Sequence, residues 1–144
     1  FSFFGGGHGG HPEGDGLSHG NAPISTATIP PLEILEAAYP VRFTQWALRP
    51  DSAGAGKHRG GLGAIYEIEV LEKSGGEAHV RIESPGGGGY GDPFERDPAT
   101  VRRDVELGYV SRERAATDYG VSVREDMTVD DSATQALRRA EGRS

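Results

Sequence analysis

The chain has 144 residues, with 15 Lys and Arg against 22 Asp and Glu, so its formal net charge is −7 when histidine is neutral. A negative chain without a basic block argues against nucleic-acid binding, because phosphates are held by clustered Lys and Arg. The absence of cysteine excludes disulfide-stapled domains, zinc knuckles and thiol nucleophiles, and it fits a reducing compartment. No run approaches the roughly 18 apolar residues of a membrane span, and no signal-peptide pattern is present, so we expect a cytoplasmic protein without a membrane partner.

The supply of large apolar side chains is small. Leu, Ile, Val and Phe together contribute 28 residues, about 19% of the chain, which is near the level at which chains stop folding alone. The chain also begins at Phe1 rather than at methionine. From both observations we expect a piece or subunit of a larger assembly that needs a partner.

Glycine dominates the first 30 residues. Eight glycines lie between residues 5 and 20, which predicts a long loop there. Residues 32–38, bounded by prolines, predict a short helix. Residues 41–48 predict a strand covered on two sides, because alternation places Val41 and Phe43 on one face and Trp46 and Leu48 on the other.

A hairpin follows a second glycine loop at residues 54–63. Residues 65–71 and 79–84 both alternate between apolar and polar side chains, and residues 74–76 supply a turn, so the two strands are expected to pair antiparallel. A third glycine run, at residues 86–91, ends the sheet region.

The apolar period then lengthens to that of helices. Asp97 as cap and Pro98 in the first turn predict a helix that Gly108 stops, with Val101 and Val105 inward. A second helix is expected from Ser111 to Gly120, with three side chains inward: Ala115, Ala116 and Tyr119. A last helix is expected to begin near Asp131 and to pack through four side chains: Ala133, Ala136, Leu137 and Ala140.

The expected fold class is therefore α+β, with a small antiparallel β-sheet region, long glycine-rich loops and a short helical C-terminal tail. We divide the chain into a glycine-rich loop segment (1–30), a β-rich region (31–93) and a helical tail (94–144). We expect these parts to form one domain within a larger assembly.

One cluster has the composition of a metal site. Imidazoles and a carboxylate suit zinc or manganese, which makes four residues candidate ligands: His8, His11, Asp15 and His19. Solvated loop histidines are the competing interpretation, because a glycine loop does not preset ligand directions. No catalytic residue or cofactor-binding residue is identified.

The glycine loops do not match phosphate-binding patterns. Neither residues 54–63 nor residues 86–91 read GxGxxG between a strand and a helix, and Lys57 lacks the following Ser or Thr of a Walker loop. We expect these glycines to serve tight turns, and to let backbone approach a neighbouring chain or domain closely.

Three stretches, taken in order, resemble the hydantoinase B/oxoprolinase family. Residues 31–41 resemble its PxExLE…YP segment, and residues 48–63 (LRPDSAGAGKHRGGLG) resemble its LRPDSGGAGxxRGGLG signature. The third is residues 84–93 (SPGGGGYGDP), continued by residues 95–98 and 110–121. Together they cover most of residues 30 to 123 and match the C-terminal part of the family's large subunits.

The resemblance implies a subunit or fragment of an ATP-dependent cyclic-amide hydrolase of hydantoinase or oxoprolinase type, mainly structural and not active alone. It implies a hetero-oligomer with an actin-like ATPase subunit of hydantoinase A type and the remaining hydantoinase B part. ATP and a divalent metal, zinc or manganese, would be bound by those partners. The alternatives are a subunit of a related ATP-dependent ketone carboxylase of acetone or acetophenone type, and a non-catalytic interaction module.

Overall fold

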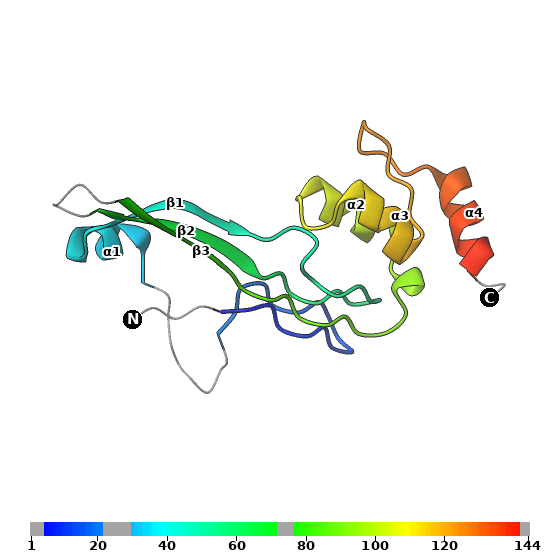
Figure 1. Cartoon of the computed structure of the whole chain (residues 1–144). Helices are drawn as coiled ribbons and strands as arrows, with labels where there is room; N and C mark the ends of the chain where they lie inside the picture. Colours follow the sequence, from blue (N-terminus) through cyan, green and yellow to red (C-terminus); the bar gives the residue numbers. More distant parts are fainter. Residues whose placement is uncertain (1–4, 22–29, 72–76, 142–144) are drawn as a thin grey trace.

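The computed structural model describes residues 5–21, 30–71 and 77–141. They form a three-stranded antiparallel sheet, glycine-rich segments and a helical C-terminal part, so the α+β prediction is confirmed. Figure 1 shows the sheet and the first helix at one end of an elongated molecule and the C-terminal helices at the other. The division into three parts stays a prediction.

Short connections arrange the sheet. Helix α1 (Leu32–Ala38) precedes β1 (Val41–Leu48), which pairs antiparallel with β2 (Ala64–Leu71). Strand β3 (Glu77–Glu83) pairs antiparallel with the other edge of β2, which confirms the predicted hairpin. The predicted turn at residues 74–76 lies outside the described residues.

A β-bulge in β1 changes which of its side chains share a face. Phe43 pairs with Ile68 but Gln45 pairs with Glu67, so Thr44 is the extra residue. Because one inserted residue reverses the alternation, the predicted separation of the β1 apolar side chains onto two faces is wrong. The predicted coverage on two sides is also wrong, since every residue of β1 is half-buried or exposed.

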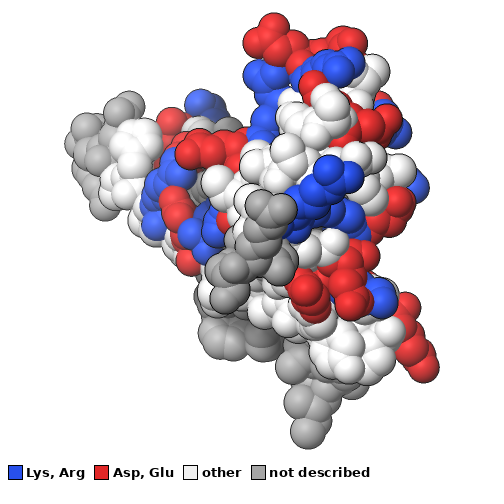
Figure 2. Space-filling model, turned by 90° about the vertical axis from the view of Figure 1, so that its right-hand side faces the viewer, with Lys and Arg blue, Asp and Glu red and all other residues white. Residues whose placement is uncertain are grey.

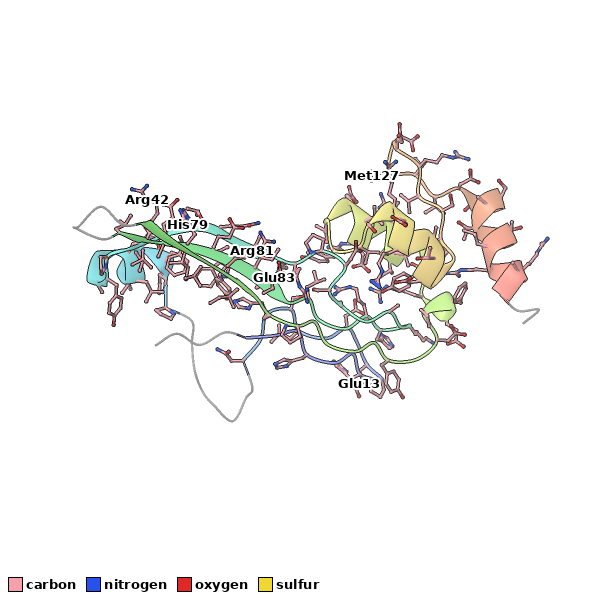
Figure 3. The ribbon with its side chains drawn as sticks, viewed as in Figure 1. Glu13, Arg42, His79, Arg81, Glu83 and Met127 are labelled. Carbon is pink, nitrogen blue, oxygen red and sulfur yellow. The ribbon has the colours of Figure 1, made fainter. Side chains whose placement is uncertain are left out.

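The sheet therefore has one apolar and one charged face. The apolar sheet face carries Val41, Phe43, Trp46, Leu48, Ala64, Tyr66, Ile68, Val70, Ala78, Val80 and Ile82. The opposite face carries cross-strand ion pairs, among them Arg42 with Glu69 and Arg81 with Glu67. Figure 3 shows Arg42, His79 and Arg81 on the side of the sheet away from α1.

The C-terminal part consists of a 3-10 turn, η2 (Pro93–Glu95), and the helices α2 (Pro98–Glu106), α3 (Arg112–Tyr119) and α4 (Asp131–Glu141). Asp97 caps α2 by accepting from the Thr100 N–H, as predicted. Gly120 ends α3 in the left-handed conformation, with φ +61°.

The main apolar core lies among these helices rather than at the sheet. It consists of Val101, Val105, Val110, Ala115, Tyr119, Val121 and Val123. The inward directions expected for Val101, Val105, Ala115 and Tyr119 are thus confirmed.

Helix α4 packs through polar side chains instead of the expected alanine stripe. Leu137 is 38% exposed, and Ala136 and Ala140 are exposed, whereas Thr134 is buried. The Thr134 hydroxyl accepts from the Ser122 N–H at 3.1 Å. The hydrogen bond between Thr134 and Ser122 therefore helps to decide which face of α4 is inward. The prediction that α4 packs through its stripe of alanine and leucine side chains is wrong.

Charges of both signs cover the helical end. Figure 2 looks onto it and shows Lys and Arg atoms interspersed with Asp and Glu atoms. In the described part of the chain, no helix combines the length and apolar character needed to cross a bilayer.

Candidate functional site

Three glycine-rich segments lie against one another and form a unit that we call the glycine frame. Its segments are residues 5–20, 54–63 and 84–91. The Gly61 N–H donates to the His8 carbonyl at 2.7 Å, and the Gly87 N–H donates to the Gly61 carbonyl at 2.9 Å. Backbone hydrogen bonds thus join segments that are far apart in the sequence.

Close backbone packing explains the glycines of the frame. A Cβ built on Gly61 would lie 2.0 Å from the Leu17 carbonyl oxygen, and one on Gly87 would lie 2.0 Å from that of His8. Of the frame's described glycines, only Gly91 has a positive φ. The tight-turn prediction is therefore wrong for most of the frame, where the glycines let the chain's own backbone segments approach one another closely. The close approach of a neighbouring chain or domain stays a prediction.

A buried arginine ties the frame to the helices. Arg96 is 3% exposed, and its guanidinium makes five hydrogen bonds. It donates to both Asp15 carboxylate oxygens at 2.7 Å, twice to Asp104 at 2.8 and 3.2 Å, and to the Lys57 carbonyl at 2.9 Å. A guanidinium has five N–H donors. These five bonds therefore use every donor of the Arg96 guanidinium within the chain.

A second buried arginine completes the cluster. Arg59 is 5% exposed, its Nε lies 3.5 Å from Asp104, and its guanidinium lies 5.2 Å from the centre of the Tyr109 ring. Its backbone N–H donates to Asp15 at 2.7 Å. We call Asp15, Arg59, Arg96 and Asp104 the ion network; it contains two positive and two negative side chains.

Mutual pairing favours the charged forms of Asp15 and Arg96. Burial raises the pKa of Asp15, but the hydrogen bonds and charge of Arg96 outweigh burial, so the pKa lies below its usual value. Burial likewise lowers the pKa of Arg96, and Asp15 and Asp104 more than compensate, so that pKa is raised. The network is therefore a structural tie whose members neutralise one another.

An open cleft of about 400 Å³ lies beside the network. Glu13, Lys57, Glu95 and Thr100 contribute to its lining, together with Asp15 and Arg96. Lys57 and Glu95 form an ion pair across 3.0 Å, and Figure 3 shows Glu13 at the tip of the first frame segment. The polar groups of this cleft thus bond largely to one another.

The structure uses two of the four predicted metal ligands for other contacts. Asp15 belongs to the ion network. His19 Nδ1 lies 3.0 Å from the Gly5 carbonyl, and its Nε2 bonds to the Tyr66 hydroxyl. Because a carbonyl only accepts, Nδ1 donates to Gly5 and Nε2 accepts from Tyr66, so neither ring nitrogen is open to a metal.

The other two histidines do not complete a ligand set. The His11 ring lies 3.4 Å from the Glu13 N–H, and the His8 backbone N–H bonds to Leu17. Within residues 5–21, 30–71 and 77–141, no group of three or more His, Asp or Glu side chains is arranged to hold a metal ion.

The His19 ring instead anchors the frame to the apolar sheet face. The Tyr66 ring centre lies 5.3 Å from that of His19 and 4.6 Å from that of Trp46. Burial raises the pKa of Tyr66 to about 12, although the Trp46 side chain, by donating to its hydroxyl, opposes this. Burial also raises the pKa of Tyr119 to about 12, in the helical core.

The raised pKa values of Tyr66 and Tyr119 predict that the protein loses stability at alkaline pH. Because the folded protein favours the protonated phenols, their stabilising contribution is present below the unfolded pKa of 10.0 and is lost as pH rises towards 12. We expect urea-unfolding midpoints to fall over this window, and the slope to flatten in Tyr66→Phe and Tyr119→Phe. An unchanged slope in both variants would contradict this assignment.

The ion network was not predicted from the sequence, although one signal was available. Asp104 lies between Val101 and Val105 on the inward face of a predicted helix, and a carboxylate on such a face requires a cationic partner. The sequence does not say which arginine supplies it, because Arg59 and Arg96 come from other segments.

Comparison with known proteins gives this arrangement a context. The family model described as hydantoinase B/oxoprolinase matches residues 1–80. The beta subunit of caprolactamase from Pseudomonas jessenii is 31% identical over 76% of this chain and 28% of its own length.

Two solved structures share the fold. The ATP-dependent caprolactamase from Pseudomonas jessenii aligns with 93% of this chain and 32% of its own, with 28% identity and a TM-score of 0.77. A nucleotide-free acetone carboxylase aligns with 96% of this chain and 29% of its own, with 24% identity and a TM-score of 0.79. The chain thus spans about a third or less of the proteins it matches.

Proposed function

Because the chain belongs to the hydantoinase B/oxoprolinase family, we propose that it is the scaffold portion of a B-type subunit in an ATP-dependent cyclic-amide hydrolase. In this proposal it acts with the remaining part of that subunit and with an ATPase subunit of hydantoinase A type. The chain frames the catalytic site and is inactive alone.

One observation carries the proposal. The chain superposes on the ATP-dependent caprolactamase over 93% of its own length, and it spans only 32% of that protein. Caprolactam, hydantoin and 5-oxoproline share a ring amide, which is a poor electrophile. Phosphorylation of the amide oxygen would make it reactive, which is a reason for coupling the reaction to ATP.

The described geometry supports a scaffolding role. The glycine frame is joined by backbone hydrogen bonds, and the five donors of Arg96 bond within the chain. In the proposal, ATP and a zinc or manganese ion bind to the other parts of the assembly and supply the activation and the Lewis acid. This chain fixes the position of the surrounding polypeptide.

Reconstitution tests the proposal. The chain would be co-expressed with the remaining B-type polypeptide and the ATPase subunit, and ATP-dependent ring opening would be measured with hydantoin, 5-oxoproline and caprolactam. We expect a co-purifying complex whose turnover is lost when the chain is omitted. Turnover that is unchanged without the chain would contradict the proposal and support a non-catalytic interaction module.

A ketone carboxylase is the second candidate. The acetone carboxylase superposes over 96% of the chain, but at 24% identity this likeness shows the fold alone. The same complexes would be assayed for ATP-dependent incorporation of labelled bicarbonate into acetone and acetophenone. Carboxylation without ring opening would favour this candidate over the hydrolase.

A further inference from the structure

The half of the sheet that lies farther from the glycine frame presents a continuous apolar patch. Ile68 lies opposite Val80, and Val70 lies opposite Ala78, so these four side chains adjoin on the apolar sheet face. Val80 is 42% exposed, Ala78 is exposed, and Ile68 and Val70 are half-buried. We call these four residues the β2–β3 patch.

Within the described residues, the groups that contact the apolar sheet face, helix α1 and the His19 ring, do so outside the β2–β3 patch. Helix α1 lies along β1, where Glu36 accepts from the Phe43 N–H at 2.7 Å. The His19 ring covers the face around Trp46 and Tyr66, at the end near the glycine frame. Helix α1 lies on the side of the sheet away from Arg42, His79 and Arg81 (Figure 3), and its Ile34 is 59% exposed.

The opposite face shows what a solvent-facing surface of this sheet looks like. Arg81 is paired with Glu67 and Glu83, and His79 lies 3.9 Å from Glu69. Adjacent residues of β3 thus point alternately to a charged face and to an apolar one. A strand that is apolar on one side only is typical of a sheet packed on that side.

We propose that the β2–β3 patch is the docking surface for the part of the B-type subunit that lies outside this chain, which covers it with an apolar segment. This inference rests on the proposed function. Relatives carry far more polypeptide than the chain spans, since it covers 28–32% of the caprolactamase chains. The patch contains no charged side chain, so its partner is apolar, as in permanent interfaces.

Single cysteines test the docking surface, because the chain contains none of its own. Val80→Cys would place a thiol in the patch, and His79→Cys would place one on the charged face of the same strand. Thiol labelling of each peptide would be followed by mass spectrometry, for the chain alone and in the assembled subunit. We expect assembly to slow labelling of Val80→Cys by about tenfold or more, and of His79→Cys by less than about twofold, because an interface core excludes solvent.

Matched lysine substitutions give the second measurement. Val80→Lys should weaken association with the remaining subunit part by about tenfold or more, because a charge would be buried against an apolar segment. His79→Lys places a cation beside Glu69 on the charged face and should leave association unchanged.

Three results would overturn the inference. An active complex in which Val80→Cys labels as fast as in the chain alone would remove the docking surface but leave the proposed function intact. Concentration-dependent protection of Val80→Cys in the chain alone would assign the patch to a second copy of this chain. Failure of the wild-type chain to form any complex would contradict the proposed function, and the inference with it.

Discussion

Arg96→Met should lower the free energy of unfolding by about 3–5 kcal/mol, because it leaves the buried Asp104 carboxylate, and the partly exposed Asp15 carboxylate, without their principal cation. Asp104 is 6% exposed and cannot regain water without opening the helical part. We expect a lower urea midpoint and faster hydrogen exchange in residues 54–63, measured on the chain alone and in complex with its partners.

Two further variants define the cause of this loss. Arg81→Ala removes an arginine that is also paired with two carboxylates, but its side chain is 52% exposed, so we expect a much smaller loss of stability than for Arg96→Met. Asp15→Asn in the Arg96→Met background removes the unpaired charge and keeps the oxygen that accepts from Arg59, so it should restore part of the stability. An Arg96→Met loss no greater than that of Arg81→Ala would show that the network is not a structural tie.

Gly87→Ala should lower the free energy of unfolding by about 3 kcal/mol or more, because its Cβ would collide with backbone rather than with a movable side chain. The Cβ would lie 2.0 Å from the His8 carbonyl oxygen and 2.2 Å from its carbon. This collision is relieved only if residues 5–20 and residues 84–91 of the frame move apart. We expect loss of hydrogen-exchange protection in residues 5–20 and 84–91.

The neighbouring glycine provides the control. A Cβ on Gly88 would meet no atom within 4 Å, and Gly88 does not have a positive φ. Gly88→Ala should therefore change stability by less than about 1 kcal/mol, and it could be stabilising because alanine restricts the unfolded chain. Equal effects of Gly87→Ala and Gly88→Ala on stability would mean that the backbone around Gly87 can move apart at little cost, which would contradict the close packing of the frame.

The frame and the network together explain how a chain with few apolar residues holds an extended arrangement. Its main cluster of buried apolar side chains lies within residues 101–123, on the helical side. The remainder relies on backbone hydrogen bonds between glycine-rich segments and on one buried ion cluster. Both devices depend on precise geometry, which is why single substitutions at Gly87 and Arg96 carry the largest expected effects.

Local signals in the sequence predicted the elements well where neighbouring residues decide the conformation. Asp97 followed by Pro98 marked the start of α2, and Gly120 marked the end of α3. Alternation in residues 65–71 and 79–84 predicted the hairpin and its pairing. These features depend on caps, turns and side-chain period, which act over a few residues.

The sequence alone determined the elements, the α+β class and, through three motifs, the family. Tertiary structure alone decided the face of β1 beyond the Thr44 bulge, the polar packing face of α4, the packing of glycine against glycine, and the partners of Asp104. The physical reason is range: propensity and periodicity act between near neighbours in the chain, whereas a backbone-to-backbone approach or an ion pair joins residues that are far apart in it, such as Asp15 and the buried Arg96. Such pairs become neighbours only when the chain has folded.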